Sequence, residues 1–193
     1  MPALVRLILV LFVLAVTSCA ESHADNVIVG KVVAVADGDT ITVLEKRTQY
    51  RIRLYGIDAP ERGQDFGNRA RQFVAAMVFG KQVRVVKHDV DRYGRIVGIV
   101  YVGDLCVNEE LVRNGLAWVY RYYCKIPVCR DWLALESQAR AGKGGLWSHP
   151  DPVPPWEFRR HKRSKQQLKD FQRTNMRETC GAKREHLSYL QKK

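Results

Sequence analysis

The sequence predicts a mainly β domain with added helices (α+β), in which five short strands close into a small barrel and about three helices pack around it. Three observations carry this prediction. Runs of β-branched residues with strand-like alternation occupy residues 27–56 and 81–104, one helical pattern lies between them, and two more helical patterns follow. With 193 residues, 46% of them hydrophobic, the chain can bury the core of one ordinary domain and still carry an appendage.

The first three strands come from residues 27–56. The run VIVGKVVAVADGDTITVLEK is divided by Asp37-Gly38, a pair that is typical of a hairpin turn. The run QYRIRLYG at residues 49–56 predicts the third strand, because its arginines alternate with Ile52 and Leu54 and so fall on the opposite face.

A helix is predicted over residues 68–80, where Ala70, Phe73, Val74 and Met77 form one apolar stripe. The remaining elements are strands at 81–90 and 95–104 on either side of a turn, and helices at 107–115 and 129–145. This order matches a five-stranded Greek-key barrel of the OB type, and the periodicity leaves another small α+β arrangement open.

Residues 1–24 are predicted to be a signal peptide. One early cation, Arg6, precedes an apolar run that is too short to span a bilayer, and Ser22-His23-Ala24 is typical of a cleavage site. Val16-Thr17-Ser18-Cys19 allows a second interpretation, a lipoprotein signal that would leave Cys19 lipidated and the protein attached to a membrane. An uncleaved anchor is the third. We expect an exported protein, secreted or periplasmic.

Cysteine usage agrees with export to an oxidising compartment. Removal or lipidation of Cys19 leaves Cys106, Cys124, Cys129 and Cys180, which allow three disulfide pairings. Cys124 and Cys129 are the favoured pair because they lie close together around a proline. A zinc site is weakly supported without a second tight pair, and Cys106 can equally be a buried free thiol.

The composition changes at Ser148, so that residues 25–149 form the predicted domain and residues 150–193 a proline-rich linker with a basic tail. From Trp156 onward there are 12 Lys and Arg against 4 Asp and Glu, which supplies +8 of the formal net charge of +12. Such asymmetry indicates a polyanion-binding appendage, and a merely solvated helix is the alternative. We expect the prolines at 152, 154 and 155 to hold the tail away from the barrel.

Three charged clusters lie at turns beside the predicted strands, at residues 37–40, 53–61 and 91–95. Taken singly, each is an ordinary polar turn. Together they contain what phosphodiester hydrolysis requires. Carboxylates from different loops can hold a hard divalent cation, two arginines can bind phosphate oxygens, and a further glutamate can deprotonate a water molecule.

Five blocks in order, VADGDTITV, IRLYGIDAPE, DRYGR, VNEELVRNGLAWVY and RAGKGGLW, resemble the signature blocks of the thermonuclease family, the staphylococcal-nuclease-like domains. The resemblance runs from about Val27 to Trp147 and does not include the tail. It implies an OB-fold barrel and Ca²⁺-dependent cleavage of DNA and RNA at the 5′ P–O bond, which leaves 3′-phosphates.

The resemblance also implies roles for individual residues. The metal-binding carboxylates of the family fall on Asp39 and Asp58, and its metal-binding main-chain carbonyl falls on Ala59, where many relatives have threonine. The phosphate-binding arginines fall on Arg53 and Arg95, and the general-base glutamate on Glu61. Asp37 and Thr40 fall on neighbouring supporting positions.

The segment WVYRYYCKIPVC departs from the family pattern. Tyr123 matches one nucleotide-stacking tyrosine, but Arg121 stands where the other would be. Stacking by Tyr120 or Tyr122 also remains open, as does plain core packing. Two rival functions are a non-catalytic module that binds single-stranded nucleic acid and a cationic surface-adhesion protein. DNA and RNA are the expected partners, and no obligate protein partner is evident.

Overall fold

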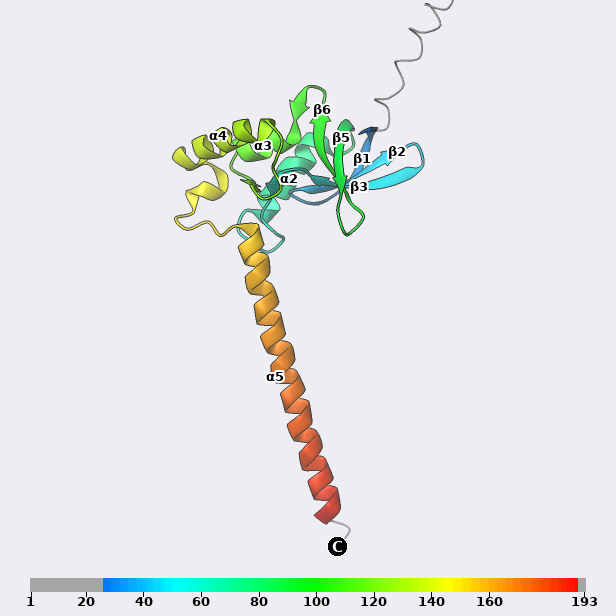
Figure 1. Ribbon diagram of the computed structural model, residues 1–193, viewed down its shortest axis with the longest axis vertical. Coiled ribbons are helices and arrows are strands. Elements are labelled where there is room, and N and C mark those ends of the chain that lie inside the picture. Colours follow the sequence, from blue (N-terminus) through cyan, green and yellow to red (C-terminus); the bar gives the residue numbers. More distant parts are fainter. Residues whose placement is uncertain (1–25, 191–193) are drawn as a thin grey trace, which may run out of the picture.

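A computed structural model describes residues 26–190, and within them it leaves out the side chains of residues 174, 175 and 177–190. Its five long strands are β1 (Val27–Asp37), β2 (Thr40–Glu45), β3 (Thr48–Leu54), β5 (Gln82–Val90) and β6 (Ile96–Val102). They lie side by side in the order β3-β2-β1-β5-β6, and a parallel pairing of β3 with β6 closes the sheet into a barrel (Figure 1). The predicted five-stranded OB-type barrel is confirmed.

The alternation of apolar and polar residues determines which side chains enter the barrel. In β3, Ile52 and Leu54 are buried, Arg51 is exposed, and the Arg53 side chain retains 15% exposure. The hairpin between β1 and β2 turns at the predicted place, where Asp37 pairs with Thr40. Asp39 is therefore held at the end of the barrel, next to the strand that carries Arg53.

Three helices cover the barrel, as expected: α2 (Gly67–Val78), α3 (Val107–Arg113) and α4 (Val128–Ala141). A short 3₁₀ helix, η3 (Gly145–Ser148), follows α4. The sequence did not indicate the two-residue strands β4 (Ile57–Asp58), β7 (Leu105–Cys106) and β8 (Trp118–Val119). The pairing of β4 with β8 sets Asp58 opposite Trp118 and so ties the segment after β3 to the aromatic segment before α4.

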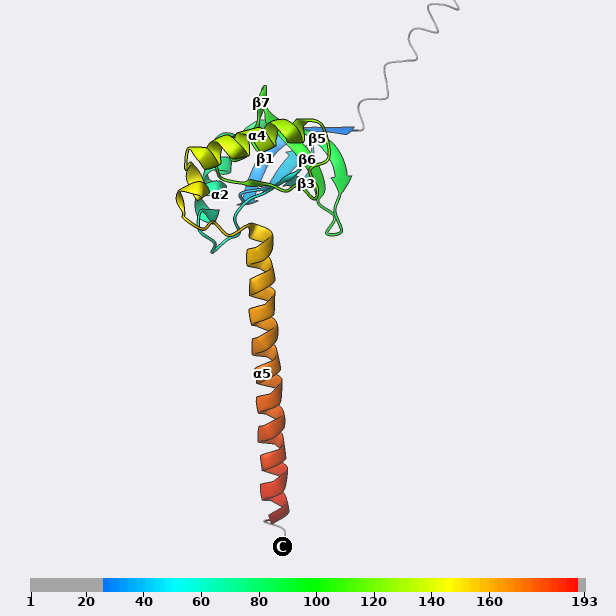
Figure 2. The same cartoon turned by 60° about the vertical axis from the view of Figure 1, so that its left-hand side comes forward.

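The basic tail forms one helix, α5 (Pro155–Leu190), 36 residues long, which projects from the barrel as a straight rod in both views (Figures 1 and 2). The prolines before it lie in a segment without regular secondary structure, and Pro155 begins the helix. The expectation that they hold the basic segment away from the barrel is wrong for its first turns. Arg159 reaches Asp58 and Glu61 of the barrel, because the linker leads the helix start onto the domain.

The favoured disulfide is confirmed: Cys124 and Cys129 are bonded, with 5.7 Å between their Cα atoms. Cys106 is a free thiol, half-buried, and its burial raises its pKa. The Cys180 side chain, the proposed signal peptide and Cys19 lie outside what the structure describes. Among the helices described for residues 26–190, none has the length and apolar character needed to cross a membrane.

Candidate active site

Arg53 links the two aspartates that the sequence singled out. Its Nη2 donates to Oδ1 of Asp58 at 2.7 Å, and its Nη1 forms an ion pair with Oδ2 of Asp39. The Asp58 side chain is fully buried. The chain delivers it there because Gly56, with φ of +68°, turns β3 directly into β4. Burial lowers the pKa of Arg53 and the Asp58 carboxylate opposes this, but a guanidinium keeps its charge in proteins.

Three hydrogen bonds fix Asp39. Its Oδ2 accepts from the backbone N–H of Ala59 at 2.8 Å, and its Oδ1 accepts from the Thr40 hydroxyl at 3.2 Å. Its own N–H donates to Asp37 Oδ1 at 3.2 Å. Asp37 and Thr40 therefore orient Asp39, and Ala59 lies directly against its carboxylate. These contacts suit the supporting positions on which Asp37 and Thr40 were predicted to fall.

Arg95 comes to the same place from the turn between β5 and β6. Asp91 accepts from its backbone N–H at 3.0 Å and from its Nε at 2.7 Å, while its Nη1 lies 3.4 Å from the Thr40 hydroxyl. Burial alone would raise the pKa of Asp91, but the hydrogen bonds from Arg95 and Tyr93 outweigh it and lower that pKa. Asp91 was not predicted as a site residue, although its spacing of four from Arg95 was a usable signal.

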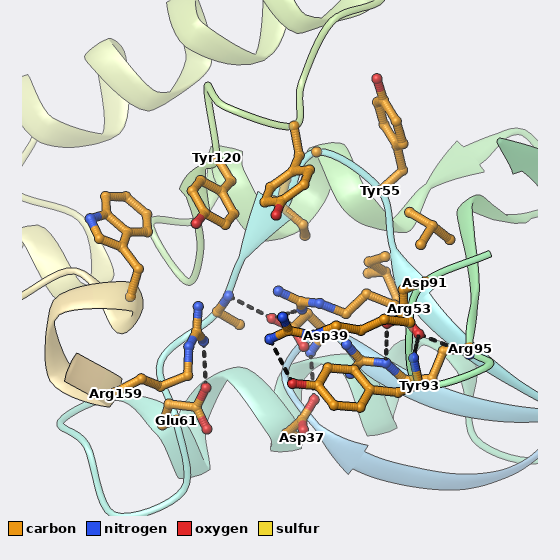
Figure 3. Close-up of a pocket in the computed structure, with 18 of the residues that line it drawn as sticks. Asp37, Asp39, Arg53, Tyr55, Glu61, Asp91, Tyr93, Arg95, Tyr120 and Arg159 are labelled. Carbon is orange, nitrogen blue, oxygen red and sulfur yellow. Dashed lines mark hydrogen bonds and ion pairs between the residues drawn. The ribbon is translucent and has the colours of Figure 1, made fainter. Parts of the chain in front are cut away.

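Glu61 follows the Pro60 turn and faces the cavity. Its backbone N–H donates to Gln64 Oε1 at 3.0 Å, and its carboxylate accepts from Nη1 of Arg159 at 2.5 Å (Figure 3). Nη2 of Arg159 also donates to Oδ2 of Asp58 at 2.7 Å. Nothing in the sequence singled out Arg159, which is one cation in a basic run. Burial opposes its charge, but its bonds to Asp58 and then Glu61 raise its pKa well above the ordinary value.

An aromatic group lines the side of the cavity nearest α5. Tyr123 is exposed, so the core-packing alternative does not apply to it, and it makes an edge contact with Tyr120 at 4.9 Å between ring centroids. Trp156 of α5 stacks on Tyr120, also at 4.9 Å, with ring planes 10° apart. Trp156 contacts Trp118 as well, which fastens the start of the helix to the domain.

One cavity of about 1080 Å³ collects these groups. Of the predicted site residues, the following line it: Asp37, Asp39, Arg53, Ala59, Glu61, Arg95 and Tyr123. Asp58 and Thr40 lie just behind the wall and touch it through Arg53 and Arg95. The structure therefore brings the predicted set together, and it adds Trp156 and Arg159 from the tail.

Comparison with known proteins identifies the family of this chain. The family described as staphylococcal nuclease homologue matches residues 51–149, which is half of the chain. An uncharacterized endonuclease of Escherichia coli is 48% identical over 145 residues, covering 75% of this chain and 89% of that protein. The chain belongs to the family of staphylococcal nuclease homologues.

Two further relatives carry different names. A micrococcal nuclease of Shigella flexneri is 46% identical over 140 residues, covering 68% of this chain and 80% of that protein. Protein ParB of Escherichia coli is 43% identical over 167 residues, covering 82% of this chain and 92% of that protein.

The staphylococcal nuclease match does not cover the whole site. Arg53, Asp58, Glu61 and Arg95 lie within residues 51–149, but Asp39 precedes the matched range. Arg159, which touches Asp58 and Glu61, follows it. The site of this staphylococcal nuclease homologue is thus completed from both sides of the matched segment.

Proposed function

We propose that this nuclease depends on Ca²⁺ and hydrolyses both DNA and RNA, leaving 3′-phosphates. One observation carries the proposal. Asp39, two arginines and Glu61 line a single cavity, the buried Asp58 lies directly behind its wall against Arg53, and the arginines are held by carboxylates that fix their direction. Preorganised charges of this kind stabilise the transition state of phosphoryl transfer.

The donor set suits a hard divalent cation. Asp39 and Asp58 offer carboxylate oxygens, and Ala59, beside Asp39, offers a carbonyl, so the ligands would all be oxygen. The described residues contain no group of three or more His, Cys, Asp or Glu side chains placed to hold a metal. Substrate phosphate and water would therefore complete the coordination shell of the cation. When bound, Ca²⁺ supplies Lewis-acid polarisation of the phosphate and a more acidic water molecule.

The protein's own residues divide the rest of the reaction. Arg53 and Arg95 bind the phosphate oxygens on which negative charge grows. Glu61 accepts a proton from the attacking water, whose oxygen bonds to phosphorus. The bond from phosphorus to the 5′-oxygen breaks, the leaving 5′-oxygen takes a proton from solvent water to become a hydroxyl, and the phosphate stays on the 3′ side.

The test is cleavage of DNA and RNA by the chain that begins at Asp25, in Ca²⁺, in Mg²⁺ and in chelator. We expect cleavage of both polymers in Ca²⁺, little in Mg²⁺, which holds its waters tightly, and none in chelator. Mass analysis of the fragments should find 3′-phosphates. Equal rates in the two metals would contradict the Ca²⁺ assignment, and 5′-phosphate products would contradict the direction of cleavage.

Glu61→Gln separates this proposal from the rival binding module. The substitution should abolish most cleavage and leave nucleic-acid binding intact, because the amide cannot accept the proton of water. A module that only binds single strands would instead show binding that neither chelator nor Glu61→Gln changes, with no cleavage in any metal. The presence of all the predicted aspartates, arginines and the glutamate favours a nuclease over the binding module.

We also propose that the protein is exported, with residues 1–24 removed. The oxidised Cys124–Cys129 pair supports this, because such bonds persist in oxidising compartments. Mass analysis of the mature chain should give an N-terminus at Asp25. A lipidated Cys19 at the N-terminus would instead establish the membrane-attached form.

A further inference from the structure

The first turns of α5 enter the site that the proposed function assigns to metal and phosphate. Both oxygens of Asp58 are engaged: Oδ1 accepts from Arg53 at 2.7 Å and from Arg159 at 3.2 Å, and Oδ2 accepts from Arg159 at 2.7 Å. Arg159 also holds Glu61 at 2.5 Å. One guanidinium thus occupies the carboxylates on which cation binding and proton transfer are proposed to depend.

We propose that Arg159 is an internal competitor of the metal, and that α5 thereby restrains the nuclease until Ca²⁺ and substrate displace this side chain. The inference rests on the proposed function and concerns the regulation of the same site. A divalent cation would bind the same Asp58 oxygens that accept from Arg159, and it repels a guanidinium placed on that carboxylate. Occupation by Arg159 and occupation by metal therefore exclude each other.

The start of α5 is fastened independently of Arg159. Trp156 stacks on Tyr120, Pro155 is buried, and the Val153 carbonyl accepts from the Gln64 side chain at 2.6 Å. Gln64 also accepts from the Glu61 backbone, so the linker and the glutamate share one anchor. The helix is thus held against the cavity whether or not Arg159 contacts the carboxylates.

Arg159 itself can leave without undocking the helix. Its side chain is 31% exposed, and a change of rotamer suffices to withdraw it from Asp58. Arg160 and Arg163 line the same cavity one residue and one turn further on. A phosphate that enters offers Arg159 a new bidentate partner, so substrate and metal favour the same released state.

The decisive measurement is Ca²⁺ affinity without nucleic acid, by calorimetry on the mature chain. Arg159→Gln should bind Ca²⁺ about tenfold more tightly than the wild type, within the range usual for coupled ligands. Lys165→Gln removes the same charge from an exposed position of α5 that does not line the cavity, so the Ca²⁺ affinity of this control should stay within about twofold of the wild type. Arg159→Lys keeps the charge but loses the bidentate geometry, so its Ca²⁺ affinity should lie between those of the wild type and Arg159→Gln.

A second readout follows the release itself. Ca²⁺ should increase hydrogen exchange only slightly in the backbone of residues 156–160, because Trp156 keeps the helix docked. It should also shift the guanidinium resonance of Arg159 in NMR spectra. The inference is overturned if Arg159→Gln binds Ca²⁺ as the wild type does, or more weakly, since Arg159 would then position the carboxylates and not compete for them.

The two proposals fail in different ways. A wild type that binds no Ca²⁺ and cuts no nucleic acid would remove the proposed function and this inference with it. A wild type that binds Ca²⁺ and cuts DNA, with Arg159→Gln unchanged in affinity, would remove the inference alone. Thermal unfolding of each variant establishes that the compared proteins are folded.

Discussion

At the scale of single residues, Arg53 has two functions that one substitution would reveal. It neutralises Asp39 and the fully buried Asp58, and it is the proposed phosphate ligand. Arg53→Gln should lower kcat by about 10²–10⁴ and affect KM little, as for loss of a preorganised charge. Steady-state kinetics checks this. A rise in KM alone would mean that Arg53 serves substrate binding and not the chemical step.

The same substitution should also lower stability. A buried carboxylate that loses its partner costs about 3–5 kcal/mol, and we expect the lower end because Arg159 still contacts Asp58. Denaturant unfolding at neutral pH measures the change. An unchanged midpoint would mean that the contact between Arg53 and Asp58 does not stabilise the folded protein.

Asp91 provides a pH-dependent prediction. Its pKa in the folded protein lies below the value of about 3.9 that is usual for an unfolded aspartate, so its pairing with Arg95 contributes stability above that pH. The contribution is lost as the pH falls through the lower folded-state pKa. Asp91→Asn should therefore be less stable than the wild type at about pH 7, and the difference should shrink toward about pH 3. Urea unfolding under both conditions tests this, and a constant difference would contradict it.

At the scale of elements, the turn at Gly56 joins the barrel to the site. Its φ is +68°, and an added Cβ would lie 2.6 Å from the Cys124 sulfur. Gly63 is a matched control, with φ of +85° and nothing within 4 Å of an added Cβ. Gly63→Ala should cost about 1–2 kcal/mol from the backbone alone, and Gly56→Ala about 3 kcal/mol or more. Thermal unfolding compares them. Equal losses of stability in the two variants would mean that the loop containing the Cys124–Cys129 disulfide moves to accommodate the added Cβ without cost.

The elements that the sequence predicted are those with a repeated pattern. The alternation in β3 and the apolar stripe of α2 specify which faces are buried, so both could be predicted from a few residues. The two-residue pairing of β4 with β8 could not, because it is held by tertiary contacts and has no period. Arg159 was missed for a related reason: nothing local separates it from its neighbouring cations, and only the docking of Trp156 brings it to Asp58.

The site likewise contains features that the sequence predicts and features that it does not. Asp39 and Asp58 were expected to meet because both follow predicted turns and match family positions, and the structure joins them through Arg53. Tyr123 lines the cavity as expected, but Tyr120 lies closer to the tail through its stack with Trp156. No sequence pattern links residues 120 and 156, since the contact depends on the path of the linker.

At the scale of the whole molecule, the catalytic cavity and the basic helix α5 lie in different parts of the protein. The barrel domain holds the cavity with its carboxylates, and α5, whose sequence is rich in Lys and Arg, projects from the domain as a straight rod (Figure 2). Such a helix can follow phosphates without reading bases, because it offers charge and few groups placed for base edges. We therefore expect the outer part of α5 to set affinity for long nucleic acids and the cavity to set the chemical step.

Truncation tests this division. A chain ending at Trp147 would lose Trp156 and Arg159 together with the rod, so a chain ending at Gln167 is the sharper variant, because it keeps every tail residue that lines the cavity. It loses seven Lys and Arg against three acidic residues. Duplex binding should weaken at low salt, and the slope of log K against log salt should flatten by about 0.9 for each phosphate that the protein no longer neutralises.

Turnover of a dinucleotide is the control, because Asp39, Asp58, Arg53, Glu61, Arg95 and Arg159 all remain in the shortened chain. That rate should match the wild type, while cleavage of long DNA at limiting concentration should fall with the affinity. Thermal unfolding must show that the shortened protein is folded. If a folded, truncated protein kept the full salt slope, the outer helix would not hold nucleic acid, and a membrane surface or a protein partner would be its better match.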